Sequence, residues 1–148
     1  MQAVRAMAKR KRIGFAAHNE KKEELIECLK NYRHILRHHI LYGTGTTGLQ
    51  IQQELKLPVT LVHSGPLGGD QEMGAMIAKG ELDILIFLID PLSPQSHWAD
   101  IAALVRIAQV YNIACETTTT AIKFLLTSKL MEESCTREIS LTGYRSAH

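Results

Sequence analysis

The chain has 148 residues, of which 45% are hydrophobic and 22% charged, which is the usual range for one compact domain. Its 17 Lys and Arg residues nearly balance its 15 Asp and Glu residues, so a strongly basic or acidic protein is excluded. Part of the excess lies in the run Lys9-Arg10-Lys11-Arg12. We therefore expect residues 1–11 to form a basic N-terminal extension and residues 12–148 to form a single domain.

Composition also limits which binding partners and which cellular compartment are expected. The basic run has no interleaved aromatic residues, which favours a solvated chain end over a contact with nucleic acid or lipid. The apolar stretch at residues 84–89 is too short to span a bilayer, and no charged-then-apolar leader opens the chain. The cysteines are odd in number and lack CxxC spacing. A cytoplasmic protein without nucleic-acid or membrane partners is expected.

Seven histidines are many for this length, and three of them cluster at His34, His38 and His39. They lack the accompanying cysteines or carboxylates that metal sites need. We therefore expect surface or interface histidines and no metal site.

Short apolar or β-branched runs alternate with longer amphipathic ones, which predicts an α/β domain around a mostly parallel sheet. Helices are expected to end near residues 32, 55, 79, 111 and 126. An additional edge strand is expected at residues 137–141. The five strands of the sheet are expected at residues 13–17, 39–42, 59–62, 83–88 and 113–115.

In a parallel sheet, ligands bind beyond the carboxyl ends of the strands, where the βα loops gather. The second of these loops is rich in threonine and glycine, and it offers hydroxyls, free amides and a helix N-terminus to a phosphate. It lacks a lysine at Walker spacing and a full GxGxxG pattern, so neither a nucleoside triphosphate nor a dinucleotide is indicated. The alternative is a capped turn without a ligand. The residues concerned are Thr44, Gly45, Thr46, Thr47 and Gly48.

Neighbouring loops add polar groups to the same edge. Ser64 and Gly65 follow the third strand, while His18 and Lys22 follow the first. Together with the threonine-rich turn, these residues could enclose a phosphate, although Lys22 alone would be typical of a solvated helix position.

Carboxylates and a histidine complete the predicted pocket. Asp70 begins a helix after two glycines, where it could cap the helix or remove a proton from a carbon next to a carbonyl. Asp90 ends the buried fourth strand. His97 could carry protons between substrate oxygens if Asp100, three residues later, orients it. No GxSxG elbow precedes a serine, which disfavours a serine hydrolase.

These motifs resemble those of the methylglyoxal synthase family over about residues 12–126. The most specific of them is SGPLGGDQ at residues 64–71. The others are FAAH at 15–18, YGTGTTG at 42–48, DPL at 90–92 and HxxD at 97–100.

The resemblance implies a single Rossmann-like three-layer domain that eliminates phosphate from dihydroxyacetone phosphate, through an enediolate, to give methylglyoxal. It also implies a homohexamer that inorganic phosphate can inhibit, without a metal or organic cofactor. Asp70 would be the base and His97 the proton shuttle, with Asp90 and Asp100 in the same pocket. The implied substrate-binding residues are His18, Lys22, Thr44, Gly45, Thr46, Thr47, Ser64 and Gly65.

Three departures separate this chain from the family pattern. Asn19 stands where the family usually has Asp, residues 116–120 read ETTTT where the family tends to have an Asn-containing segment, and the tail is divergent. Arg145 is a weak candidate for a tail arginine that binds phosphate in some members. The rival functions are a regulatory ligand-binding domain of the same fold and a phosphosugar isomerase or phosphatase.

Overall fold

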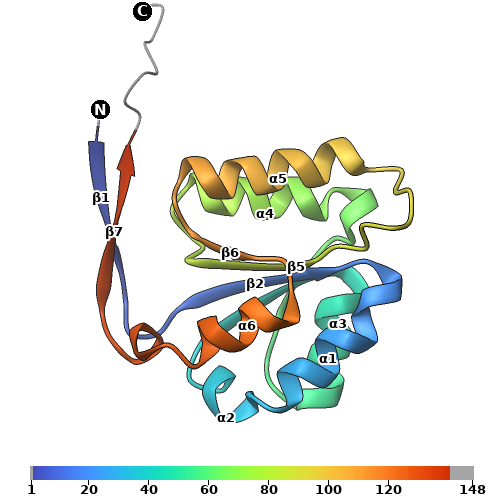
Figure 1. Ribbon diagram of the computed structural model, residues 1–148, viewed down its shortest axis with the longest axis horizontal. Coiled ribbons are helices and arrows are strands. Elements are labelled where there is room, and N and C mark those ends of the chain that lie inside the picture. The colour runs from blue at the N-terminus through green and yellow to red at the C-terminus, as the bar shows by residue number, and fades with distance from the viewer. Residues whose placement is uncertain (1, 141–148) are drawn as a thin grey trace, which may run out of the picture.

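The computed structural model describes residues 2–140, with a five-stranded parallel sheet at its centre (Figure 1). The strand order is β4-β3-β2-β5-β6, and each neighbouring pair is parallel. The predicted α/β fold with five strands is confirmed. The strands are β2 (Arg12–Ala17), β3 (Ile40–Thr44), β4 (Thr60–Val62), β5 (Ile84–Leu88) and β6 (Ala114–Glu116).

Helices cover both faces of the sheet and make three layers. Helices α1, α3 and α6 pack on one face, and α4 and α5 pack on the other (Figure 1). The α-helices are α1 (Lys22–Lys30), α2 (Arg33–Leu36), α3 (Gly45–Leu55), α4 (Gly69–Ala78), α5 (Trp98–Val110) and α6 (Thr119–Leu126). The 3₁₀ turns are η1 (Asn19–Lys21), η2 (Gly65–Leu67) and η3 (Lys129–Glu132).

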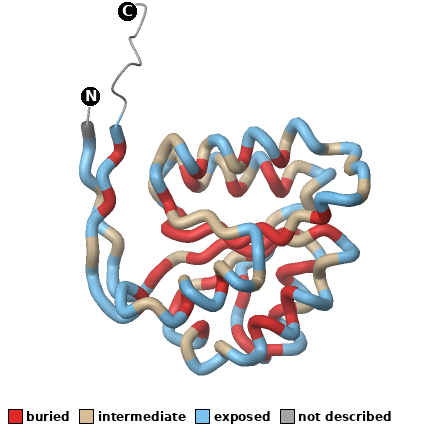
Figure 2. The backbone as a smooth tube through the Cα atoms, in the orientation of Figure 1, coloured by how far each residue is buried: buried red, intermediate tan, exposed pale blue. Residues whose placement is uncertain are grey.

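Strand β5 separates two hydrophobic cores. Side chains of successive strand residues point to opposite faces, so Ile84 and Ile86 join the core under α1, α3 and α6. Leu85 and Phe87 join the core under α4 and α5. All five residues of β5 are buried, and Figure 2 shows the buried segments running along the middle of the sheet. The uninterrupted apolar sequence is therefore that of a central parallel strand.

A two-stranded ribbon stands beside the main sheet (Figure 1). It pairs β1 (Gln2–Met7) with β7 (Cys135–Ser140) in antiparallel register. The strand expected at residues 137–141 therefore exists, but its partner is β1 and not an edge of the main sheet. Leu141 lies outside the described residues, and the division of the chain at residue 11 remains a prediction.

Two residues of the basic run are held by the protein: Lys11, and Arg12, whose guanidinium pairs with Asp83. Lys11 is 1% exposed, and its Nζ donates to the carbonyl oxygen of Ala8 at 2.6 Å and to that of Glu133. The run was expected to be a solvated chain end, which is wrong for Lys11, because its ammonium joins the chain before β2 to the segment before β7. Lys9 and Arg10 are exposed.

The helices were compared with the length and hydrophobicity that a membrane span requires. Over residues 2–140, none is both long enough and apolar enough to cross a bilayer.

A buried carboxylate ties the first residue of β2 to the amino end of β5. The side chain of Asp83 is 1% exposed and accepts three hydrogen bonds from Arg12. These come from the backbone N–H at 2.8 Å, from Nε at 3.1 Å and from Nη2 at 3.0 Å. The guanidinium of Arg137 lies 3.7 Å away. A fully paired buried carboxylate of this kind is costly to disrupt.

Asp83→Asn should lower the free energy of unfolding by about 3 kcal/mol, because it leaves the half-buried Arg12 and the buried Arg137 without their counter-charge. Urea unfolding followed by circular dichroism would measure the change. Glu81→Gln, which removes an exposed carboxylate two residues away, is the control and should shift stability by less than about 0.5 kcal/mol. Equal stabilities of the two variants would contradict this account.

Candidate active site

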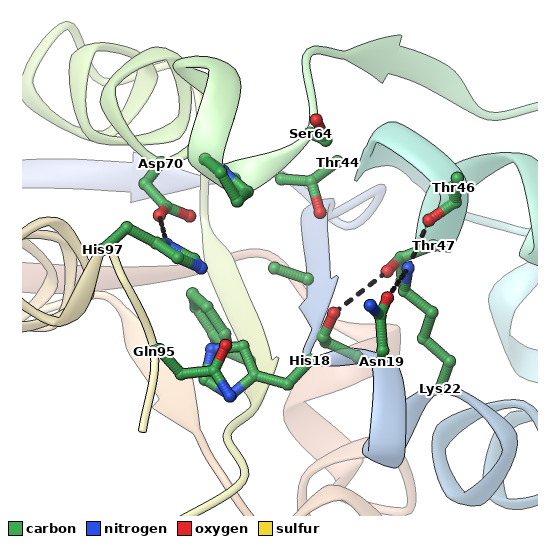
Figure 3. Close-up of a pocket in the computed structure, with 15 residues that line it drawn as sticks. His18, Asn19, Lys22, Thr44, Thr46, Thr47, Ser64, Asp70, Gln95 and His97 are labelled. Carbon is green, nitrogen blue, oxygen red and sulfur yellow. Dashed lines mark hydrogen bonds and ion pairs between the residues drawn. The ribbon is translucent and has the colours of Figure 1, made fainter. Parts of the chain in front are cut away.

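A cavity of about 260 Å³ opens at the carboxyl edge of the sheet, where the loops after β2, β3, β4 and β5 meet. Figure 3 shows Asp70 and His97 on one side of this pocket and Lys22 and Thr46 on the other. Of the predicted site residues, the lining contains His18, Lys22, Thr44, Thr46, Thr47, Ser64, Gly65, Asp70 and His97. Gly45, Asp90 and Asp100 are not part of the lining.

One side of the pocket is an anion cradle at the start of α3. Thr44 ends β3, and the helix begins at the next residue, so free amides of the first helical turn face the pocket. Gly45 has φ +35, and a Cβ there would come within 2.6 Å of Ser64 Cβ. A glycine is therefore required where the two predicted phosphate loops touch.

Lys22 adds a cation to this cradle. Its Nζ donates to Asn19 Oδ1 at 2.8 Å and to the hydroxyl of Thr46. Burial lowers the pKa of the Lys22 ammonium, and the nearby Glu20 carboxylate opposes that shift. Asn19 thus accepts from the lysine as an aspartate would, but without a negative charge to compete with a bound anion.

The loop after β4 lies between the anion cradle and the two catalytic candidates, Asp70 and His97. A Cβ at Gly65 would lie 3.0 Å from His97 Cε1 and 3.2 Å from Asp70 Oδ1. A Cβ at Gly69 would lie 1.9 Å from the carbonyl oxygen of His63. A larger residue at Gly69 would force the backbone apart, and one at Gly65 would crowd the side-chain ends of His97 and Asp70, so both glycines favour the close approach.

Asp70 has one oxygen held and one oxygen free. Its side chain is 1% exposed, and Oδ2 lies 2.8 Å from His97 Nδ1. Oδ1 is buried and has no hydrogen-bond partner among the described residues. Gly68 is the N-cap of α4, with no side-chain capping bond, so the alternative of Asp70 as a capping residue is not observed. A buried carboxylate oxygen without a partner at a pocket wall is typical of a functional group.

His97 takes its orientation from Asp70 and not from Asp100. The imidazole is hydrogen-bonded to Asp70, whereas the backbone N–H of Asp100, in the first turn of α5, donates to the carbonyl oxygen of His97 at 3.0 Å and leaves the ring untouched. The expectation that Asp100 orients the ring is therefore wrong. Ligand atoms of Asp70, His97 and Asp100 nevertheless all lie within 4.8 Å of one another, which is a spacing that could hold a metal ion. The expected absence of a metal remains a prediction.

Asp90 contributes its backbone to the site. The amide of Asp90 donates to His18 Nδ1 at 2.8 Å, whereas its carboxylate accepts from Leu92 N at 3.0 Å. Hydrogen bonds from the Ser93 hydroxyl and then from Leu92 lower the pKa of this carboxylate. Asp90 was predicted to place a carboxylate at the pocket. The structure instead uses that carboxylate to close its own loop.

His18 is a neutral hydrogen-bond donor. Because Nδ1 accepts a hydrogen bond, the ring proton resides on Nε2, which is buried and has no partner within residues 2–140. Burial lowers the pKa of His18 first, and the neighbouring His97 lowers it further. The ring packs edge-on against Phe87 at 5.4 Å between centroids.

Six lining residues were not among the predicted site residues, and four of them, Ala16, Ala17, Asn19 and Pro66, lie within or next to the motifs given above. Phe87 forms part of the wall from within β5, and only its place near the carboxyl end of that strand could have indicated it. Gln95 lies in the loop between β5 and α5, where nothing in the sequence distinguishes it. Arg145, the weak candidate for phosphate binding, lies outside the described residues.

Comparison with known proteins identifies the family. A family model described as an MGS-like domain matches residues 24–117. A methylglyoxal synthase of Leptospira interrogans is 54% identical over 111 residues, covering 74% of this chain and 75% of that protein. The chain belongs to the methylglyoxal synthase family.

Further relatives of the methylglyoxal synthase family cover nearly the whole chain. A methylglyoxal synthase of Erwinia tasmaniensis is 42% identical over 144 residues, which is 97% of this chain and 93% of that protein. The crystal structure of the Elizabethkingia anophelis enzyme superposes with a TM-score of 0.88 at 38% identity, covering 93% of this chain and 91% of that one. The resemblance predicted from the motifs is confirmed.

The tautomer and the lowered pKa of His18 can be measured directly. We expect nitrogen-15 NMR to show the proton on Nε2 at pH 7 and a titration midpoint below the ordinary value of 6.5. Because the folded pKa is lowered, the unfolded chain takes up this proton at the higher pH. The contribution of His18 to stability is therefore present above pH 6.5 and is lost as the pH falls through the folded pKa. A proton on Nδ1, or a midpoint above 6.5, would contradict the geometry.

Proposed function

We propose that the chain is a lyase that converts dihydroxyacetone phosphate into methylglyoxal and inorganic phosphate. One observation carries this proposal: the free, buried oxygen of Asp70 lines the same small pocket as the anion cradle at the start of α3. A phosphate bound in the cradle would present its carbon chain to this carboxylate. Relatives named methylglyoxal synthase, similar over most of their length, support the lyase over a regulatory domain.

The phosphate is bound by donors from three loops. Lys22 supplies charge, Thr46 and Thr47 supply hydroxyls, and the first turn of α3 supplies amides. Ser64 and Gly65 close the other side. Because these donors are in place before the reaction, they stabilise charge on the departing phosphate without reorganisation.

The reaction begins when Asp70 Oδ1 removes a proton from the hydroxymethyl carbon next to the carbonyl. The electron pair of the broken C–H bond forms the carbon–carbon double bond of an enediolate, and negative charge develops on the former carbonyl oxygen. The Nε2–H of His18 is a donor without a partner inside the described pocket, and in this proposal it binds that oxygen. Burial favours the neutral form of the ring, so His18 stabilises the charge by hydrogen bonding.

His97 then moves the enediol protons. Its Nδ1 is engaged with Asp70, which leaves Nε2 to exchange protons with the substrate hydroxyls. The former carbonyl oxygen gains a proton and the terminal hydroxyl loses one. The electrons of the terminal O–H bond form the aldehyde C=O, the carbon–carbon double bond shifts to the phosphate-bearing carbon, and the phosphate leaves with the C–O bonding pair. The remaining enol takes up a proton on carbon to become methylglyoxal. Holding the leaving C–O bond across the enediolate plane favours elimination over return of the proton.

Assembly, inhibition and location remain predictions of this proposal. The family resemblance supports a homohexamer that inorganic phosphate inhibits by occupying the cradle. The three free cysteines support a cytoplasmic location.

Asp70→Asn should reduce phosphate release from dihydroxyacetone phosphate at least about 100-fold, because an amide cannot accept the carbon-bound proton. Binding of inorganic phosphate to the same variant, measured by calorimetry, should be at least as tight as in the unmodified protein. Enzymatic assay of methylglyoxal and phosphate gives the rate.

Glu138→Gln, which removes an exposed carboxylate from β7, is the matched control and should keep full activity. Substantial turnover by Asp70→Asn would contradict the role of the base. Glyceraldehyde 3-phosphate as the product of the unmodified protein would contradict the lyase itself.

A further inference from the structure

Two features of the sequence have no part in the proposed chemistry, and the structure brings them together. Lys9 and Arg10 of the basic run and the three histidines at residues 34, 38 and 39 line one hollow of about 740 Å³. The hollow lies at the amino ends of β2 and β3, next to the β1–β7 ribbon and at the opposite edge of the sheet from the active site (Figure 1). Its lining is Lys9, Arg10, His34, Ile35, Arg37, His38, His39, Met131 and Glu132.

The positive charge around this hollow is not neutralised by the protein. Lys9, Arg10 and Arg37 are exposed, and their side chains form no hydrogen bond or salt bridge with any described residue. Glu132 is the one carboxylate in the lining, and within residues 2–140 it forms no salt bridge. The three permanent cations outnumber this single carboxylate, and such an excess of positive charge around a hollow attracts anions.

His39 provides a donor of fixed direction in the same place. The backbone N–H of Lys11 donates to His39 Nδ1 at 2.9 Å, so the ring proton is on Nε2. The residue is 8% exposed, and burial is the main reason that its pKa is lowered. The charges of Lys11, His38 and Arg10 lower that pKa further, which reports the local positive potential. An anion bound in the hollow would offset these positive charges and raise the pKa of His39.

The size and the apolar part of the lining indicate what kind of anion would fit. The hollow is nearly three times the volume of the active-site cavity, whose volume is about 260 Å³. Ile35 is half-buried and gives the lining an apolar surface, whereas Met131 is 3% exposed and belongs to the core. Ligand sites of this volume hold molecules larger than a phosphate ion.

We propose that this hollow is a second binding site, for a phosphate-bearing small molecule of nucleotide size. Arg10, Arg37 and Lys9 bind the phosphates, since guanidinium groups match phosphate oxygens in geometry and charge. The apolar body of the ligand covers Ile35. This site is separate from the phosphate cradle and does not depend on the proposed lyase activity.

Adenosine diphosphate is the probe, added to the full-length chain at about 0.15 M salt so that weak surface attraction is screened. Nitrogen-15 NMR of the imidazoles should show shifts for His34, His38 and His39 that saturate at one ligand per chain. His18 and His97 report any separate binding at the active site. Calorimetry should show pyrophosphate binding more weakly than adenosine diphosphate, because it lacks the apolar body.

Arg37→Gln should weaken binding of adenosine diphosphate about tenfold. Arg106→Gln, which removes an exposed arginine from α5, changes the net charge equally and should leave the affinity unaltered. Both variants should release phosphate from dihydroxyacetone phosphate at the normal rate. The proposal is overturned if the three imidazoles do not respond, if the two variants bind equally, or if pyrophosphate binds as tightly as the nucleotide.

Discussion

The site depends on the close contact between the glycine-rich loop after β4 and the pair formed by Asp70 and His97. Gly65 fits against both side chains because it has no Cβ, and Gly69 fits against the backbone of His63 for the same reason. A loop with larger residues would have to move away, which would separate the phosphate donors from the carboxylate. The glycines therefore convert several separate loops into one pocket of fixed width.

Within this pocket, the two histidines are set for different tasks by the groups bonded to Nδ1. His18 accepts a hydrogen bond there from the amide of Asp90, which places its proton on Nε2 and makes it a donor. His97 is held at Nδ1 by a carboxylate, which leaves Nε2 for proton exchange. Burial favours the neutral form of His18, so it can bind a developing negative charge without first losing a proton.

Much of the fold could be predicted because its signals are local. The uninterrupted apolar sequence of β5 is typical of a central parallel strand. The threonine- and glycine-rich turn before α3 is typical of an anion site at a helix N-terminus. The partner of β7 could not be predicted, because pairing with β1 depends on packing between the two ends of the chain. The predicted pocket residues largely meet, but Gly45, Asp90 and Asp100 lie outside the lining. The position of the Asp90 carboxylate depends on a loop hydrogen bond that sequence spacing does not reveal.

A crystal structure with bound phosphoglycolate, a planar two-carbon phosphate that resembles the enediolate, would test the central claim most directly. The account predicts that its phosphate lies against Thr46, Thr47, Ser64 and Lys22. Asp70 Oδ1 should then be about 3–3.5 Å from the carboxylate oxygen of the ligand that takes the place of the hydroxymethyl carbon. A phosphate bound elsewhere in the pocket, or an Asp70 side chain turned away from the ligand, would contradict it.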